Sequence, residues 1–196
     1  MSHTRANAAG RDARVFNVAC GPAQEVQEFL AEQPISARCD ITLLDFNEET
    51  LRHARAALSD RKSRHGRTTS LNFIKKSVQS ILKESGRTIE RPPQNQYDLV
   101  YCAGLFDYLS DQVCHRLLNV MYAWLAPGGL LIATNVEPSN PLRNGMEHLL
   151  DWHLIYRTGA EMMKLRPPEG HADQARVLAE ATGTNVFLEV RKPSHV

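Results

Sequence analysis

The sequence lacks the features that define several classes of protein. No apolar run reaches the ~18 residues that a membrane-spanning helix needs, and the polar N-terminus, MSHTRANAAGRDAR, has no apolar signal-peptide core. Lys and Arg number 23 and Asp and Glu number 22, so there is no basic excess for binding nucleic acid through its phosphates. We therefore expect a cytoplasmic protein with no membrane span and no nucleic-acid partner.

Cysteine is scarce as well, and its spacing is not that of a metal site. The four cysteines form no C-x-x-C pair, and the eight histidines form no H-E-x-x-H motif. A neutral cytosolic domain does not need disulfides, and these spacings predict no metal site. We expect Cys20 and Cys102 to be small apolar packing residues rather than nucleophiles.

The sequence does contain a strand, a tight loop, a helix and a second strand that ends on an acid. Residues 15–19 lead into the loop Cys20-Gly21-Pro22-Ala23, and a helix-forming segment, 24–32, follows. A second apolar stretch, 41–44, ends on Asp45. In such a unit the loop lets backbone N–H groups approach a ligand, and the acid accepts hydrogen bonds from a ribose. The pattern predicts a ligand with a ribose joined to adenine.

The composition of the loop narrows the ligand further. One glycine followed by proline and alanine is not G-x-G-x-x-G, and the loop lacks the Lys and Ser/Thr of a P-loop. Both departures favour a nucleoside without phosphates, and S-adenosylmethionine fits that description. A strand-loop-helix unit without any ligand is the alternative for this segment alone.

Further along the chain, strands alternate with helices, and the 196 residues are expected to form a single domain. We predict strands near residues 14–19, 41–45, 71–76, 97–102, 130–136, 175–181 and 184–191, helices near 23–32, 48–59, 78–85, 111–125, 143–152 and 158–165, loops at 59–70 and 84–96, and a turn at 138–141. This alternation predicts an α/β fold with a mostly parallel sheet and helices on both faces. The last two strands flank a turn at Gly183 and should form a hairpin.

Four segments resemble, in order and spacing, the motifs of class I S-adenosylmethionine-dependent methyltransferases: NVACGPA, ITLLDFNEETLRHA, YDLVYCAGLFDYL and LAPGGLLIATN. The resemblance implies a Rossmann-like, seven-stranded sheet with one antiparallel strand from the C-terminal hairpin. Asn17 stands where an acid is common in these enzymes, so it carries no charge to meet the ammonium of the methionine moiety. Ala19 and Ala23 stand where glycines are common. Because alanine tolerates positive φ poorly, we expect the loop to use backbone conformations that alanine adopts readily.

The resemblance implies S-adenosylmethionine as cofactor and indicates residues that contact it. The firmest assignment is Asp45, whose carboxylate can accept from both ribose hydroxyls, followed by Phe46 against the adenine. Gly21 would let the backbone approach the methionine part, and Gly104 would lie near the sulfonium. The full set is Asn17, Ala19, Cys20, Gly21, Pro22, Asp45, Phe46, Ser77, Val78, Ala103 and Gly104. Ordinary packing at a strand end explains Val78 and Ala103 equally well.

A narrower resemblance concerns the acceptor of the methyl group. The segments EHLLDWHLIYRTGAEM and TGTNVFLEVRKP resemble a bacterial group linked to biosynthesis of 3-hydroxypalmitic acid methyl ester. This implies a small-molecule substrate, and we expect the methyl acceptor to be the carboxylate of a fatty-acid-like compound. The candidate acceptor-site residues are Asp107, Tyr108, His148, His153 and Arg157.

Three functions stay open at this point. A carboxylate acceptor is already ionised and needs only orientation, which Arg157 can supply bidentately with help from Tyr108 or Tyr156. A hydroxyl or amine acceptor needs a base, and His148 or His153 is the candidate. The third is a cofactor-binding domain that has lost catalysis and acts as a partner or sensor.

In the predicted helix, spacings of three and four would place His148, Asp151, Trp152 and Ile155 on one face.

The N-terminus is short relative to this family. Thirteen residues precede Arg14, whereas many methyltransferases place one or two lid helices there. We expect either that residues 1–13 form a flexible or partial lid, or that the chain is one domain of a longer protein. The oligomeric state is not indicated by the sequence.

Overall fold

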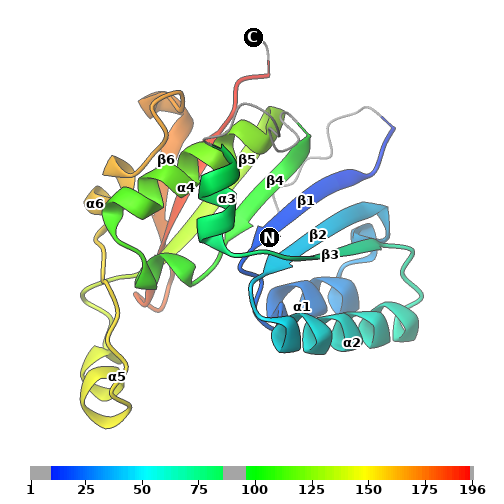
Figure 1. The fold of residues 1–196 in the computed structure, drawn as a ribbon, viewed down its shortest axis with the longest axis horizontal. Helices are drawn as coiled ribbons and strands as arrows, with labels where there is room; N and C mark the ends of the chain where they lie inside the picture. Colours follow the sequence, from blue (N-terminus) through cyan, green and yellow to red (C-terminus); the bar gives the residue numbers. More distant parts are fainter. Residues whose placement is uncertain (1–9, 86–95, 195–196) are drawn as a thin grey trace.

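The fold is built on one seven-stranded sheet (Figure 1). The computed structural model describes residues 10–85 and 96–194, so most of the expected N-terminal lid and of the predicted loop at 84–96 lies outside the described residues. The strands are β1 (Ala13–Val18), β2 (Cys39–Asp45), β3 (Ser70–Lys75), β4 (Tyr97–Cys102), β5 (Leu125–Val136), β6 (Ala175–Ala179) and β7 (Asn185–Arg191). Their order is β3-β2-β1-β4-β5-β7-β6.

The predicted fold class is confirmed. The first five strands pair in parallel, while β7 is antiparallel to both β5 and β6. The turn between β6 and β7 contains Gly183 at a φ of 69°, a backbone conformation that glycine adopts without steric cost. The C-terminal hairpin therefore forms where the sequence predicts it.

Helices cover both faces of the sheet (Figure 1). Those with α-helical geometry are α1 (Gln24–Glu32), α2 (Glu48–Arg64), α3 (Val78–Ser85), α4 (Asp111–Trp124), α5 (Arg143–Leu149) and α6 (Gly159–Lys164); short 3-10 segments are η1 (Pro34–Arg38), η2 (Leu105–Tyr108) and η3 (Ala172–Gln174). One apolar cluster joins α1 and α2 to the sheet, and a second joins α3, α4 and α6 to it. In the part of the chain that the structure describes, no helix is long and apolar enough to cross a membrane.

Three predicted boundaries are wrong. Helix α2 continues through Arg64 instead of ending near residue 59, with Asp60 and Arg64 paired one turn apart at 2.8 Å and three basic residues in its last turn, where they suit the helix dipole. Strand β5 begins at Leu125, five residues before the predicted start. Gly129 allows this part of β5 to pass close to β4, since a Cβ at Gly129 would lie only 2.9 Å from the carbonyl oxygen of Tyr97.

The third boundary error concerns α5, which ends at Leu149 rather than near residue 152. Asp151 has a φ of 49°, which no helix can continue through. His148, Asp151, Trp152 and Ile155 therefore do not share one helix face, and that prediction is also wrong. Figure 1 shows α5 projecting away from the sheet.

The loop between β1 and α1 departs from expectation in its backbone. Ala19 and Ala23 have φ values of 55° and 52°, so the loop keeps left-handed conformations at both alanines instead of avoiding them. Backbone hydrogen bonds hold it, from Cys20 N to Leu44 O (2.9 Å) and from Ala23 N to Cys20 O (2.9 Å). A left-handed conformation costs an L-residue roughly 1–2 kcal/mol. The expectation of alanine-compatible conformations is therefore corrected.

This strain predicts that glycine stabilises the loop. We expect Ala19→Gly to raise the free energy of unfolding by about 1 kcal/mol, measured by urea denaturation. Ala23→Gly should raise it less, because the buried methyl group of Ala23 packs in the core. The matched control is Ala56→Gly on the exposed face of α2, which should lower that free energy by about 1 kcal/mol. Destabilisation by all three changes would show that the loop is not strained.

Candidate functional site

The predicted cofactor residues come together because four parallel strands end at one edge of the sheet. β1 lies between β2 and β4, and the chain runs outward from β1 to β3 and then returns to continue from β4. In open α/β sheets such a reversal of strand order is the place where ligands bind, outside the carboxyl ends of the strands. The loops after β1, β2, β3 and β4 all open onto this edge.

Asp45 ends β2 and is fixed by the backbone on both sides. Its Oδ2 accepts from Gly21 N at 3.0 Å, and its Oδ1 accepts from Asn47 N at 2.9 Å. The side chain is 6% exposed. Each carboxylate oxygen has a second lone pair, so both can accept from a ligand without losing these bonds. The next residue, Phe46, is 68% exposed and presents an aromatic ring beside the carboxylate.

Two glycines leave open space next to this carboxylate edge. Gly21 and Gly104 have φ values of 52° and 87°, and a Cβ built on either would meet no atom within 4 Å. Gly104 N donates to Thr134 Oγ1 at 3.0 Å, which holds the loop after β4 in place. A ligand can therefore approach the backbone of both loops closely. These residues fit a nucleoside ligand of the kind that the sequence predicts.

Three of the remaining predicted cofactor residues make contacts within the protein. Ser77 Oγ accepts from Ser80 N at 3.2 Å at the start of α3, and Val78 packs against the core. Pro22 O accepts from Gln27 Nε2 at 2.9 Å. Ala103 is exposed at the end of β4. Whether Val78 and Ala103 contact the cofactor stays a prediction.

Burial affects the chemistry of the cysteines. Cys20 is buried and free, and burial together with the nearby carboxylates of Asp45 and Glu25 raises the pKa of its thiol to about 12. Cys102 is buried as well, and burial raises the pKa of its thiol strongly. Thiols with raised pKa values are poor nucleophiles at neutral pH, consistent with packing roles.

Two residues that the sequence did not single out, Glu25 and Tyr101, contact the predicted cofactor residue Asn17 directly or through one another. Glu25, in the first turn of α1, accepts on Oε1 from Asn17 Nδ2 at 2.9 Å and from Tyr101 OH at 2.7 Å. Asn17 is 1% exposed and Tyr101 is 6% exposed. A sequence signal for Glu25 existed, because this acid in the first turn of α1 follows shortly after Asn17, the position where the resemblance leads us to expect an acid.

Asp107 follows β4 and faces the protein interior. Its Oδ1 accepts from Val136 N at 2.7 Å, and its main-chain oxygen accepts from Ile155 N at 2.8 Å. Burial raises the pKa of its carboxyl to about 6, although the Val136 N–H and the nearby Arg157 act in the other direction. The contacts give Asp107 a role in positioning the segment around Ile155.

Arg157 is structural, and its predicted contact with a carboxylate acceptor is wrong. The residue is 2% exposed. Its Nη1 donates to Phe106 O and Asn135 Oδ1, both at 2.7 Å, and its Nη2 donates to Leu109 O at 2.6 Å and Asp111 Oδ1 at 2.8 Å. Nε donates to the same Asp111 oxygen at 2.9 Å. A guanidinium has five N–H donors, and all are used within the protein.

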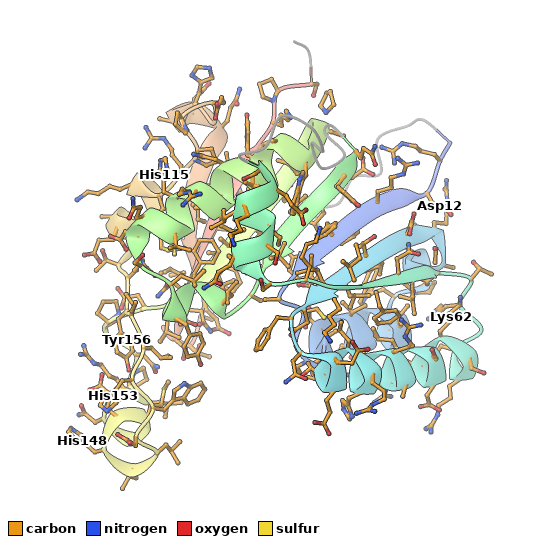
Figure 2. The ribbon with its side chains drawn as sticks, in the orientation of Figure 1. Asp12, Lys62, His115, His148, His153 and Tyr156 are labelled. Atoms are coloured by element: carbon orange, nitrogen blue, oxygen red, sulfur yellow. The ribbon has the colours of Figure 1, made fainter. Side chains whose placement is uncertain are left out.

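The other acceptor candidates lie on or against the projecting segment 142–155, which we call the arm. Figure 2 places His148 and His153 on it. Both are exposed, and His153 Nε2 lies 3.1 Å from Asp151 Oδ1. Trp152 Nε1 donates to the hydroxyl of Tyr108 at 2.8 Å, which ties the arm to η2.

The arm exposes an unusual amount of apolar surface. The exposed fractions are 84% for Leu149, 67% for Leu150, 64% for Leu142, 44% for Trp152 and 42% for Ile155. Scattered apolar residues are normal on a protein surface, but five large exposed ones within one short segment point to an interaction with apolar material.

Comparison with known proteins shows the family of this chain. The sequence pattern of a family described as a methyltransferase domain matches residues 16–131, more than half of the chain. The chain therefore belongs to this methyltransferase family. No curated protein matches the sequence.

Solved structures show the same fold at low identity. A possible exported protein from Bordetella parapertussis is 19% identical with a TM-score of 0.69, over 93% of this chain and 63% of that one. The S-adenosylmethionine-dependent methyltransferase SibL is 18% identical with a TM-score of 0.66, over 93% and 51%. Human N-acetylserotonin methyltransferase, in complex with S-adenosylmethionine, is 18% identical with a TM-score of 0.60, over 92% and 47%. The chain thus spans 47–63% of these structures, and S-adenosylmethionine is the methyl donor that its family and fold imply.

The raised pKa of Asp107 predicts a pH-dependent effect on stability. An acid whose folded pKa exceeds its unfolded value favours the folded state when protonated, so this contribution declines as pH rises from about 4 to about 6. An amide in place of this carboxyl keeps the acceptor for Val136 N and removes the buried charge. We expect Asp107→Asn to raise the free energy of unfolding by about 1–3 kcal/mol at pH 8 and to change it little at pH 4.

Urea denaturation at both pH values measures this difference. Asp173→Asn, at an exposed site, is the matched control and should have no effect at either pH. A variant that is less stable than the unmodified chain at pH 8 would show that the Asp107 charge is needed rather than tolerated.

Proposed function

We propose that this chain transfers a methyl group from S-adenosylmethionine to a small-molecule acceptor. The observation that carries the proposal is Asp45, a buried carboxylate held in one orientation at the reversal point of a methyltransferase sheet. When bound, S-adenosylmethionine supplies a methyl group that is already activated for in-line displacement. The protein has to position donor and acceptor and to exclude water.

In this proposal each element at the carboxyl edge holds one part of the donor. Asp45 accepts from the ribose hydroxyls, and the exposed ring of Phe46 stacks against the adenine. The backbone at Gly21 and Gly104 approaches the methionine and sulfonium parts, because neither residue has a side chain to fill that space.

Loss of Asp45 should weaken the donor complex. Hydrogen bonds to a charged group contribute roughly 1.5–3 kcal/mol each, so we expect Asp45→Ala to lower the affinity for S-adenosylhomocysteine at least about tenfold in calorimetric titration. Asp40→Ala is the matched control, because Asp40 lies near the opposite end of β2 and accepts from Asn72. Thermal unfolding verifies that both variants are folded. Unchanged affinity in Asp45→Ala would reject this assignment.

For the acceptor, we propose the carboxylate of a fatty-acid-like metabolite. The apolar side chains of the arm can contact an acyl chain. The hydroxyl of Tyr108 accepts from Trp152 and keeps its own proton to donate to a carboxylate. Orientation by Tyr108 then takes the place of the role first expected of Arg157.

A hydroxyl or amine acceptor is the second candidate, and one observation favours it. His153 is paired with Asp151 at 3.1 Å, an arrangement that can orient an imidazole as a general base. The two candidates differ in their need for this base, since a carboxylate nucleophile is already ionised.

Methyl transfer to a panel of acids, alcohols and amines, including 3-hydroxy fatty acids, separates the candidates. For a carboxylate, we expect His148→Ala and His153→Ala to leave turnover within a few-fold, while Tyr108→Phe raises the KM for the acid. His115→Ala on α4 (Figure 2) is the control. A good alcohol or amine substrate, or a loss of roughly 10²–10⁴-fold in His153→Ala, would replace the carboxylate with the second candidate.

A further inference from the structure

The cluster of Asn17, Glu25 and Tyr101 at the cofactor edge has a feature that packing does not explain. These residues come from the end of β1, the first turn of α1 and the end of β4. The amide of Asn17 and the hydroxyl of Tyr101 both donate to Oε1 of Glu25, at 2.9 and 2.7 Å. Three elements thus hold one carboxylate in a fixed position next to the loop at Gly21.

Both partners of this carboxylate are neutral. Burial and the neighbouring Glu25 raise the pKa of Tyr101 well above its usual value of 10, so the phenol stays protonated and acts as a donor. Among the described residues, no Lys, Arg or His forms an ion pair with Glu25, and its second oxygen, Oε2, accepts no hydrogen bond. A carboxylate with two neutral donors on one oxygen and none on the other can accept further N–H donors from a cationic ligand.

The second carboxylate near this loop, that of Asp45, is negatively charged as well. The carboxylates of Asp45 and Glu25 both raise the pKa of the Cys20 thiol, so both lie near this loop. Asp45 can be satisfied by neutral hydroxyls, because two backbone N–H groups already stabilise its charge. Glu25 lacks such backbone donors. The site is therefore prepared for a cationic group at Glu25 rather than at Asp45.

We infer that Glu25 binds the primary ammonium of the methionine part of the cofactor, and that it supplies the charge missing at Asn17. The inference rests on the proposed function. An ammonium brings three N–H donors to a carboxylate with a free oxygen, whereas the sulfonium has none. Asn17 and Tyr101 are positioning residues, because they orient the carboxylate without contacting the ligand in this account.

Two ligands separate this inference from cofactor binding in general. S-adenosylhomocysteine carries the ammonium but no sulfonium charge, and 5′-methylthioadenosine has the ribose and adenine but no amino-acid part. Glu25→Gln keeps an oxygen for Asn17 and Tyr101 and removes only the charge. Glu28→Gln, one turn further along α1 and on its exposed side, is the matched control.

By calorimetric titration, we expect Glu25→Gln to lower the affinity for S-adenosylhomocysteine roughly 10- to 100-fold. Its affinity for 5′-methylthioadenosine should stay within twofold of that of the unmodified chain. Glu28→Gln should change neither value. Adding Asn17→Asp to Glu25→Gln returns a carboxylate to the same cluster and should restore most of the lost affinity.

The outcomes distinguish this inference from the proposed function. If the unmodified chain binds neither ligand, the proposed function itself fails. If Glu25→Gln binds S-adenosylhomocysteine as tightly as the unmodified chain, the role of Glu25 is rejected while cofactor binding stands. An equal loss for both ligands, or a loss that Asn17→Asp does not relieve, would assign Glu25 a purely structural role and would also overturn the inference.

Discussion

Parallel pairing of β1 with both β2 and β4 is the constraint on which the site depends. Residues Val15 to Asn17 of β1 are paired in register with residues on both neighbours, so the three strands end at nearly the same level. Parallel strands end at the same edge, and the reversal of strand order at β1 sends the following loops apart. Asp45, Gly21 and Gly104 can face one ligand only because this register holds them together.

Around η2 and the arm, the organising residue is Arg157. Its guanidinium joins η2, the start of α4 and the end of β5 through main-chain and side-chain acceptors. Asp111, its ionic partner, has a side chain that is 76% exposed, so the ion pair alone contributes modestly. The buried carbonyl acceptors matter more, because they would lose their partner without Arg157. Through these contacts Arg157 holds the η2 segment that carries Tyr108, against which the arm lies.

In the segment NVACGPA, alanines replace the glycines and Asn17 replaces the acid that are common in these methyltransferases. The structure compensates for both changes. Alanines at positive φ strain the loop, which lowers stability at the site. Hydrogen bonds from the loop to Leu44 and Asp45 hold it in that conformation. Replacement of an acid by Asn17 removes a charge from β1, and Glu25 places one beside it from α1. The loop thus adopts the backbone conformation typical of glycine although it has alanines there, and a carboxylate lies nearby although it comes from α1 instead of β1.

Much of the fold followed from the sequence by itself. Apolar strands ending on small residues or an acid, and a hairpin turn at Gly183, predicted the mixed sheet, its helices and the position of Asp45, because these signals are local in the chain. Local signals misjudged the ends of α2 and α5, where exposed polar or apolar residues suit helix and loop equally. Arg157 was misassigned because its five acceptor contacts come from segments 22 to 51 residues away. Glu25 differs in part, since its partner Asn17 lies only eight residues away, whereas its partner Tyr101 lies 76 residues along the chain. Sequence determined which elements form, and only tertiary structure decided which charges are satisfied within the protein and which are left for a ligand.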